Sequence, residues 1–110
     1  MERLNEFYAQ ENAILIDVRQ PDEYAQGHLP GARSVPLQKL RDFSLEVTDP
    51  DTPIYVYCLS GGRSARAVRA LRGVGFTAVT DLGGINAYTG DIVDSDAEST
   101  DDIVSLCAAL

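Results

Sequence analysis

Apolar residues along the chain fall into two kinds of pattern, short continuous runs and runs with helical spacing. The continuous runs, rich in β-branched and aromatic side chains, predict buried strands over residues 13–16, 54–57 and 76–82. Residues 33–35 are interpreted as a further, shorter strand. Helical spacing predicts helices over residues 1–11, 21–26, 36–43, 64–73 and 85–89. Because the two kinds of segment alternate, we expect a parallel sheet with helices on both faces.

Two segments do not fit this alternation. Residues 44–52 are polar and acidic and predict a loop, with one helical turn within it as the alternative. Residues 95–102 are also acidic, and after them Ile103, Cys107 and Leu110 recur on one helical face. We therefore expect one domain over residues 1–94, followed by an acidic C-terminal extension over residues 95–110 that ends in a short helix.

The segment with the most candidate functional residues begins where the strand over residues 54–57 ends. Cys58 comes next, and five residues, Leu59, Ser60, Gly61, Gly62 and Arg63, lead to a helix that opens at Ser64. Open α/β sheets bind their ligands at such strand–loop–helix crossovers. The glycines let backbone N–H groups turn inward, and the helix end and Arg63 add positive charge. This pattern favours an anion beside Cys58 and a lowered thiol pKa, hence a nucleophilic thiolate.

Other polar residues are expected near this crossover. Asp17 and Asp81 lie at about the ends of predicted strands, so they should share one sheet edge with Cys58. Asp17 and Arg19 are interpreted as an ion pair or cap that supports the site, with direct substrate contact as the alternative, and Arg19 is predicted to pair with Glu23. The helix after Cys58 should bury Ala67, Val68, Leu71 and Val74 on one face.

The net charge of the chain limits the classes of partner that it is expected to bind. The 110 residues carry a net charge of -8, with 17 acidic against 9 basic side chains. This balance argues against nucleic acid or an anionic membrane as a partner. Four of the nine basic residues are the arginines at 63, 66, 69 and 72, so the cations gather behind Cys58. This suggests a small anionic substrate at that site, and Arg63 is the arginine expected to contact it.

The numbers of cysteines and histidines limit which metal sites and disulfides the chain can form. There are two cysteines, Cys58 and Cys107, and one histidine, His28. This set gives no plausible zinc site and does not require a disulfide. Cys107 is interpreted as a structural thiol, with a relay to Cys58 as the alternative. His28 is interpreted as a hydrogen-bonded structural residue, with a catalytic base as the alternative. A polar N-terminal segment and the lack of a long apolar run predict a cytoplasmic protein.

Four stretches together resemble the rhodanese family of sulfurtransferases. Residues 15–37, LIDVRQPDEYAQGHLPGARSVPL, are similar to its "DVR…E(F/Y)…GH(I/L)PGA" segment. Residues 54–71, IYVYCLSGGRSARAVRAL, are similar to its "C-x-x-G-x-R-S" loop, and the strand before Asp81 and LGGINAY over residues 82–88 complete the match. Tyr88 stands where the family usually has Trp. The resemblance implies a three-layer α/β/α rhodanese-like fold with a central parallel sheet of about five strands.

The resemblance also implies an activity. Cys58 would take a sulfane sulfur from a donor such as thiosulfate, become a persulfide, and pass the sulfur to cyanide or a thiol. A protein could also accept the sulfur, and no cofactor beyond the covalent persulfide is implied. The N–H groups of residues 59–64 would surround the outer sulfur as an oxyanion hole surrounds its anion. Catalysis then rests on Cys58, and substrate binding on Leu59, Ser60, Gly61, Gly62, Arg63 and Ser64.

Two other functions stay open. The domain could be a non-catalytic or sulfur-carrier module that docks a partner protein, which turnover with small donors would exclude. A cysteine phosphatase or arsenate reductase shares a related loop with five residues between Cys and Arg. Here four residues separate Cys58 from Arg63, and the smaller ring fits a single sulfur atom better than a phosphate.

Overall fold

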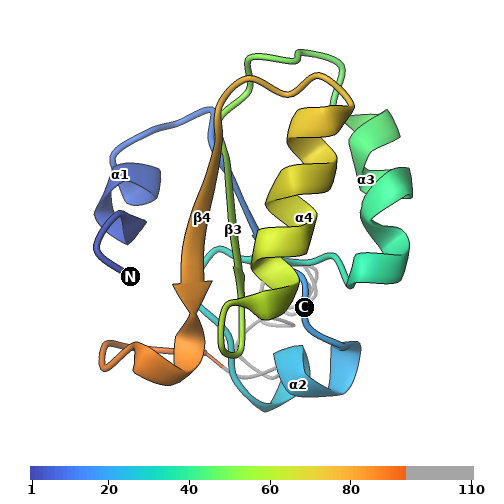
Figure 1. Cartoon of the computed structure of the whole chain (residues 1–110). Coiled ribbons are helices and arrows are strands. Elements are labelled where there is room, and N and C mark those ends of the chain that lie inside the picture. The colour runs from blue at the N-terminus through green and yellow to red at the C-terminus, as the bar shows by residue number, and fades with distance from the viewer. Residues whose placement is uncertain (94–110) are drawn as a thin grey trace, which may run out of the picture.

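The structure is a computed structural model that describes residues 1–93, and its centre is a sheet with helices on both sides (Figure 1). The strands are β1 (Ile14–Asp17), β2 (Arg33–Ser34), β3 (Ile54–Cys58) and β4 (Val79–Gly84). They lie in the order β2-β1-β3-β4, and every neighbouring pair is parallel. The predicted parallel sheet is confirmed, with four strands over these residues where about five were expected.

Two layers of helices cover the sheet. Helices α3 (Leu40–Glu46) and α4 (Gly62–Gly73) lie on one face, and α1 (Leu4–Tyr8) lies on the other. Helix α2 (Pro21–Gln26) lies below the carboxyl ends of the strands (Figure 1). Two 3-10 turns, η1 (Leu37–Lys39) and η2 (Ile85–Ala87), complete the described elements. None of the helices within residues 1–93 has the length and apolar character needed to cross a membrane.

The strands separate two hydrophobic clusters because their side chains alternate between faces. On β3, Val56 and Cys58 pack with Leu71 of α4 in one cluster. Tyr55 and Tyr57 pack in the other cluster, which also holds residues of α1 and α2. All five residues of β3 are buried, so the strand that ends at Cys58 is anchored on both faces.

Several predicted boundaries move. Helix α4 begins at Gly62 rather than Ser64, so Arg63 lies in its first turn and not in the loop. Val74, predicted on the buried face, follows the end of α4 and is 67% exposed. Helix α3 runs to Glu46, into the segment predicted as a loop. Strand β4 covers residues 79–84 rather than 76–82, and the predicted helix at the end of the 95–110 extension lies outside the described residues.

Candidate active site

The carboxyl ends of the strands bring the first site residues together. Cys58, the last residue of β3, pairs with Gly84 at the end of β4, and Asp17, the last residue of β1, pairs with Tyr57. The prediction that Asp17 and Cys58 share this edge is confirmed. Asp81 was expected there as well, but β4 continues to Gly84, and Asp81 is an exposed residue paired with Val56 further back.

The loop after β3 folds back over the Cys58 sulfur. Cys58 is 1% exposed, and the Gly61 N–H donates a hydrogen bond to its Sγ at 3.0 Å. Gly61 adopts a φ of +108°, a left-handed conformation that glycine reaches without strain, and this turns the chain into α4. The thiol in turn donates to the Ser64 Oγ at 3.5 Å, and the Ser64 hydroxyl donates to the Gly61 carbonyl at 3.0 Å. The loop and the first turn of α4 therefore both form hydrogen bonds with the Cys58 sulfur.

These contacts decide the ionisation of the thiol. Burial opposes the charged form, but hydrogen bonds from the Ser64 side chain and from the N–H groups of Ser64, Gly61 and Ser60 outweigh it. The pKa of Cys58 is therefore lowered from its ordinary value. When the thiol ionises, the Ser64 hydroxyl can turn its proton from the Gly61 carbonyl to Sγ. The site is thus equipped to hold negative charge on sulfur.

The segment after β4 braces the loop from the other side. The Asn86 N–H donates to the Leu59 carbonyl at 3.0 Å. A Cβ placed on Gly84 would lie 2.7 Å from the Ser60 Cα and still closer to the Leu59 carbonyl oxygen. Only a glycine allows this approach of two backbones. Nothing in the sequence distinguishes Gly84 from an ordinary turn glycine, so this contact was not predicted.

Arg63 forms an ion pair that was not predicted. Its Nη1 and Nη2 donate to the two carboxylate oxygens of Glu23 at 2.6 and 3.0 Å. The side chains are 30% and 27% exposed. Hydrogen bonding to Arg63 is the main cause that lowers the pKa of Glu23 to about 2. The expected pairing of Glu23 with Arg19 is therefore wrong as a direct contact, because Arg63 occupies both oxygens.

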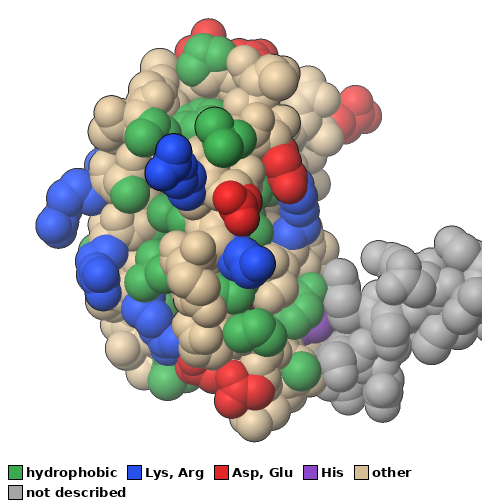
Figure 2. Space-filling model, turned by 90° about the vertical axis from the view of Figure 1, so that its right-hand side faces the viewer, with side chains coloured by type: hydrophobic (Ala, Val, Ile, Leu, Met, Phe, Trp, Pro, Cys, Tyr) green, Lys and Arg blue, Asp and Glu red, His purple; other side chains and the backbone are tan. Residues whose placement is uncertain are grey.

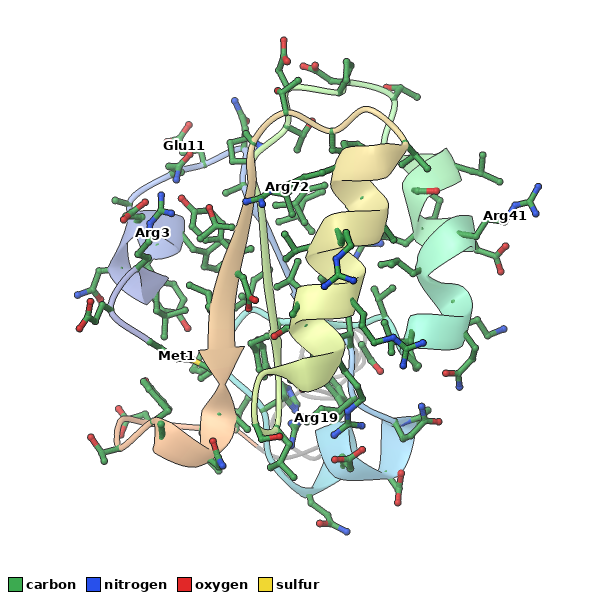
Figure 3. All side chains as sticks on the ribbon, in the orientation of Figure 1. Met1, Arg3, Glu11, Arg19, Arg41 and Arg72 are labelled. Atoms are coloured by element: carbon green, nitrogen blue, oxygen red, sulfur yellow. The ribbon has the colours of Figure 1, made fainter. Side chains whose placement is uncertain are left out.

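Arg19 pairs instead with Asp17, as the first interpretation of these two residues predicted. Its Nε and Nη2 donate to the Asp17 carboxylate at 2.7 to 3.1 Å, and Nη2 also donates to the Gly27 carbonyl at 2.6 Å. The side chains are 6% and 0% exposed. Arg19 lies below the strand ends, beside α2 (Figure 3). This pair links β1 to the end of α2 under the site.

His28 has a structural environment. It is fully buried, its Nδ1 lies 2.8 Å from the Tyr24 carbonyl oxygen, and its ring stacks on Tyr24 at 3.6 Å. Its backbone exchanges two hydrogen bonds with Val93. This geometry confirms the prediction of a hydrogen-bonded structural histidine.

The remaining arginines of α4 do not contribute to the loop. Arg66, Arg69 and Arg72 are exposed, and basic side chains gather along one side of the face in Figure 2. Arg72 donates to the Val79 carbonyl at 2.8 Å. As expected from the helical pattern, this row is mainly a solvated surface.

Comparison with known proteins identifies the family of this chain. The model of the rhodanese-like domain matches residues 1–91. The chain belongs to the rhodanese-like domain family. A solved structure titled rhodanese with anions from E. coli superposes with a TM-score of 0.68 at 32% identity, covering 74% of this chain and 98% of that one.

Curated relatives of this rhodanese-like chain carry different descriptions. Thiosulfate sulfurtransferase PspE of Escherichia coli is 37% identical over 71 residues, 64% of this chain and 68% of the relative. The uncharacterized protein YqhL of Bacillus subtilis is 43% identical over 81 residues, 73% of this chain and 64% of the relative. The chain thus spans about two thirds of the length of these relatives, and the family includes proteins named as sulfurtransferases.

Proposed function

We propose that this chain is a sulfurtransferase that carries a sulfane sulfur as a persulfide on Cys58. The observation that carries the proposal is the surroundings of the Cys58 sulfur, which receives the Gly61 N–H at 3.0 Å and lies 3.5 Å from the Ser64 hydroxyl. Donors aimed at a buried sulfur stabilise a thiolate before reaction and an anionic outer sulfur after it. Relatives named thiosulfate sulfurtransferase support the same chemistry.

The reaction divides into two displacements at sulfur. The Cys58 thiolate attacks the outer sulfur of thiosulfate, the S–S bond of the donor breaks, and sulfite leaves with the electron pair. Cyanide or a thiolate then attacks the outer sulfur of the persulfide, and the Cys58 thiolate leaves. The lowered pKa of Cys58 supplies the thiolate, so no separate base is required. The sulfur is carried by the protein itself, and the proposal includes no metal or organic cofactor.

Leu59, Ser60, Gly61, Gly62, Arg63 and Ser64 form the proposed substrate-binding loop. The backbone of this loop and the Ser64 hydroxyl hold the transferred sulfur, while Asp17 and Arg19 support the strand edge beneath it. A thiol, cyanide or a cysteine of another protein would be the acceptor in the cytoplasm. The carrier module predicted as an alternative would use the same persulfide but accept sulfur only from a partner protein.

Intact mass spectrometry tests the proposal. Incubation with thiosulfate, and separately with cysteine persulfide, should add one sulfur atom to the protein, and cyanide should remove it. Cys58→Ser should abolish the gain with an unchanged fold, because the nucleophile is gone, and Cys107→Ser should gain and lose sulfur as the parent does. Sulfur gain by Cys58→Ser would refute the assignment. A parent protein that gains no sulfur from either donor would favour the carrier module.

A further inference from the structure

Arg19 and Arg63, the two arginines predicted at the Cys58 site, each form an ion pair with a carboxylate. Arg19 forms a buried two-pronged pair with Asp17. Arg63, whose charge interacts with Cys58, forms an equally direct pair with Glu23. These four side chains add no net charge to the site. Arg63, which is expected to contact an anionic substrate, therefore has its charge already paired with Glu23.

Glu23 is held in its position independently of Arg63. It lies in the first turn of α2, and its Oε1 also accepts the Gln20 N–H at 3.1 Å in a capping box. Its carboxyl stays ionised at neutral pH because its pKa is lowered to about 2, chiefly by the bond to Arg63. Glu23 is therefore a fixed negative charge that faces the first turn of α4, directly beside the Cys58 loop.

A cavity of about 310 Å³ opens next to this carboxylate. Its lining includes the charged residues Arg19 and Glu23 and the larger side chains Ile85, Tyr88 and Ile92. The last three belong to the segment after Gly84, the residue that pairs with Cys58. Leu59, the residue after Cys58, is 42% exposed. The cavity therefore offers room and apolar surface for an organic group next to the segment that braces the Cys58 loop through the Asn86 to Leu59 hydrogen bond.

From these observations we propose that Glu23 is a specificity-determining residue that directs the Cys58 site toward organic persulfides and away from dianionic donors such as thiosulfate. The inference rests on the proposed function and deepens it. The Cys58 thiolate attacks the outer sulfur of R–S–SH, the S–S bond of the donor breaks, and R–S⁻ leaves with the electron pair. The outer sulfur keeps its proton, and Cys58 becomes a persulfide. Thiosulfate brings two negative charges to a site where Glu23 already neutralises the charge of Arg63, whereas the organic persulfide brings at most one at its reacting end.

The test compares rates at which Cys58 gains sulfur, measured by quenched mass spectrometry with thiosulfate and with cysteine persulfide. In the parent protein the second-order rate constant should be larger for cysteine persulfide. Glu23→Gln keeps an acceptor for Gln20 and removes one negative charge. It should raise the thiosulfate rate about three- to tenfold at low ionic strength, an effect that added salt reduces, and change the persulfide rate by less than about twofold.

Two further variants test whether the change in the thiosulfate rate comes from the charge of Glu23. Arg63→Ala leaves Glu23 unpaired and should lower the thiosulfate rate relative to the persulfide rate. Glu46→Gln is the matched control, because it removes the same charge from an exposed pair with Arg33 on β2, which β1 separates from β3. It should leave both rates unchanged.

The outcomes separate specificity from structure. Equal losses with both donors in Glu23→Gln would overturn the proposal, since Glu23 would then only support the loop. A parent protein that reacts faster with thiosulfate would overturn it as well. If neither donor adds sulfur to the parent protein, the proposed function itself fails and the inference falls with it.

Discussion

Replacing Gly84 with alanine should damage the site without touching any reacting group. Gly84 has φ -108° and ψ 134°, an ordinary extended conformation that alanine adopts freely. The effect is therefore steric. The new methyl group would lie 2.7 Å from the Ser60 Cα and still closer to the Leu59 carbonyl oxygen, and ordinary contact starts at 3.4 Å, so the loop must retreat by at least about 0.7 Å.

The size of this retreat sets the expected loss. Misplacement of a catalytic centre by about 1 Å can lower a rate by about 100-fold, so we expect kcat/KM for sulfur transfer to fall by roughly 10- to 100-fold. Overpacking should also lower the free energy of unfolding by about 1–3 kcal/mol. Steady-state transfer to cyanide gives the first quantity, and urea denaturation gives the second.

Gly62→Ala is the matched control for this change. It adds the same methyl group at the start of α4, next to the loop that Gly84 contacts, but a Cβ there meets no atom within 4 Å. Its activity should stay within about twofold of the parent, and its stability should be unchanged or slightly higher. If Gly84→Ala were as active as Gly62→Ala, the close approach of the two backbones would have no role in placing Cys58.

Two further predictions concern ionisation and burial. Ser64→Ala should raise the pKa of Cys58, since burial then acts against a thiolate with fewer hydrogen bonds; the midpoint of alkylation rate against pH should move up, and an unmoved midpoint would exclude Ser64 as a donor. Arg19→Ala should lower the free energy of unfolding by about 3–5 kcal/mol because it leaves the buried Asp17 carboxylate unpaired. Arg33→Ala breaks an exposed pair and should change stability by at most about 1 kcal/mol. Equal losses in urea denaturation would contradict this argument.

The parts of the fold that sequence could predict are those encoded locally. The apolar run before Cys58 and the alternation of strands with helices were sufficient to predict the parallel sheet and the place of Cys58 at its edge. The loop around the sulfur was accessible for the same reason, since Gly61 and Ser64 follow Cys58 within six residues. Val74 was misplaced because helical spacing was extended past the true end of α4.

The contacts that sequence could not settle join distant segments. Arg19 had both Asp17 and Glu23 nearby in the sequence as possible partners, and the structure pairs it with Asp17 and pairs Glu23 with Arg63. Glu23 and Arg63 lie 40 residues apart, so no local sequence pattern indicates that they pair. Gly84 gave the same difficulty, because a turn glycine and a glycine required by a neighbouring backbone look identical in sequence.

The alternation of β3 makes the chemistry depend on parity. Tyr57 and Cys58 are consecutive, yet they belong to different clusters on opposite faces of the sheet. Removing or adding one residue between Ile54 and Tyr57 would exchange the faces of every side chain that follows in the strand. The sulfur would then turn away from Ser64 and α4, although each residue of the loop was still present. The reactive centre is therefore specified by an odd or even count along the strand as much as by the residues of the loop.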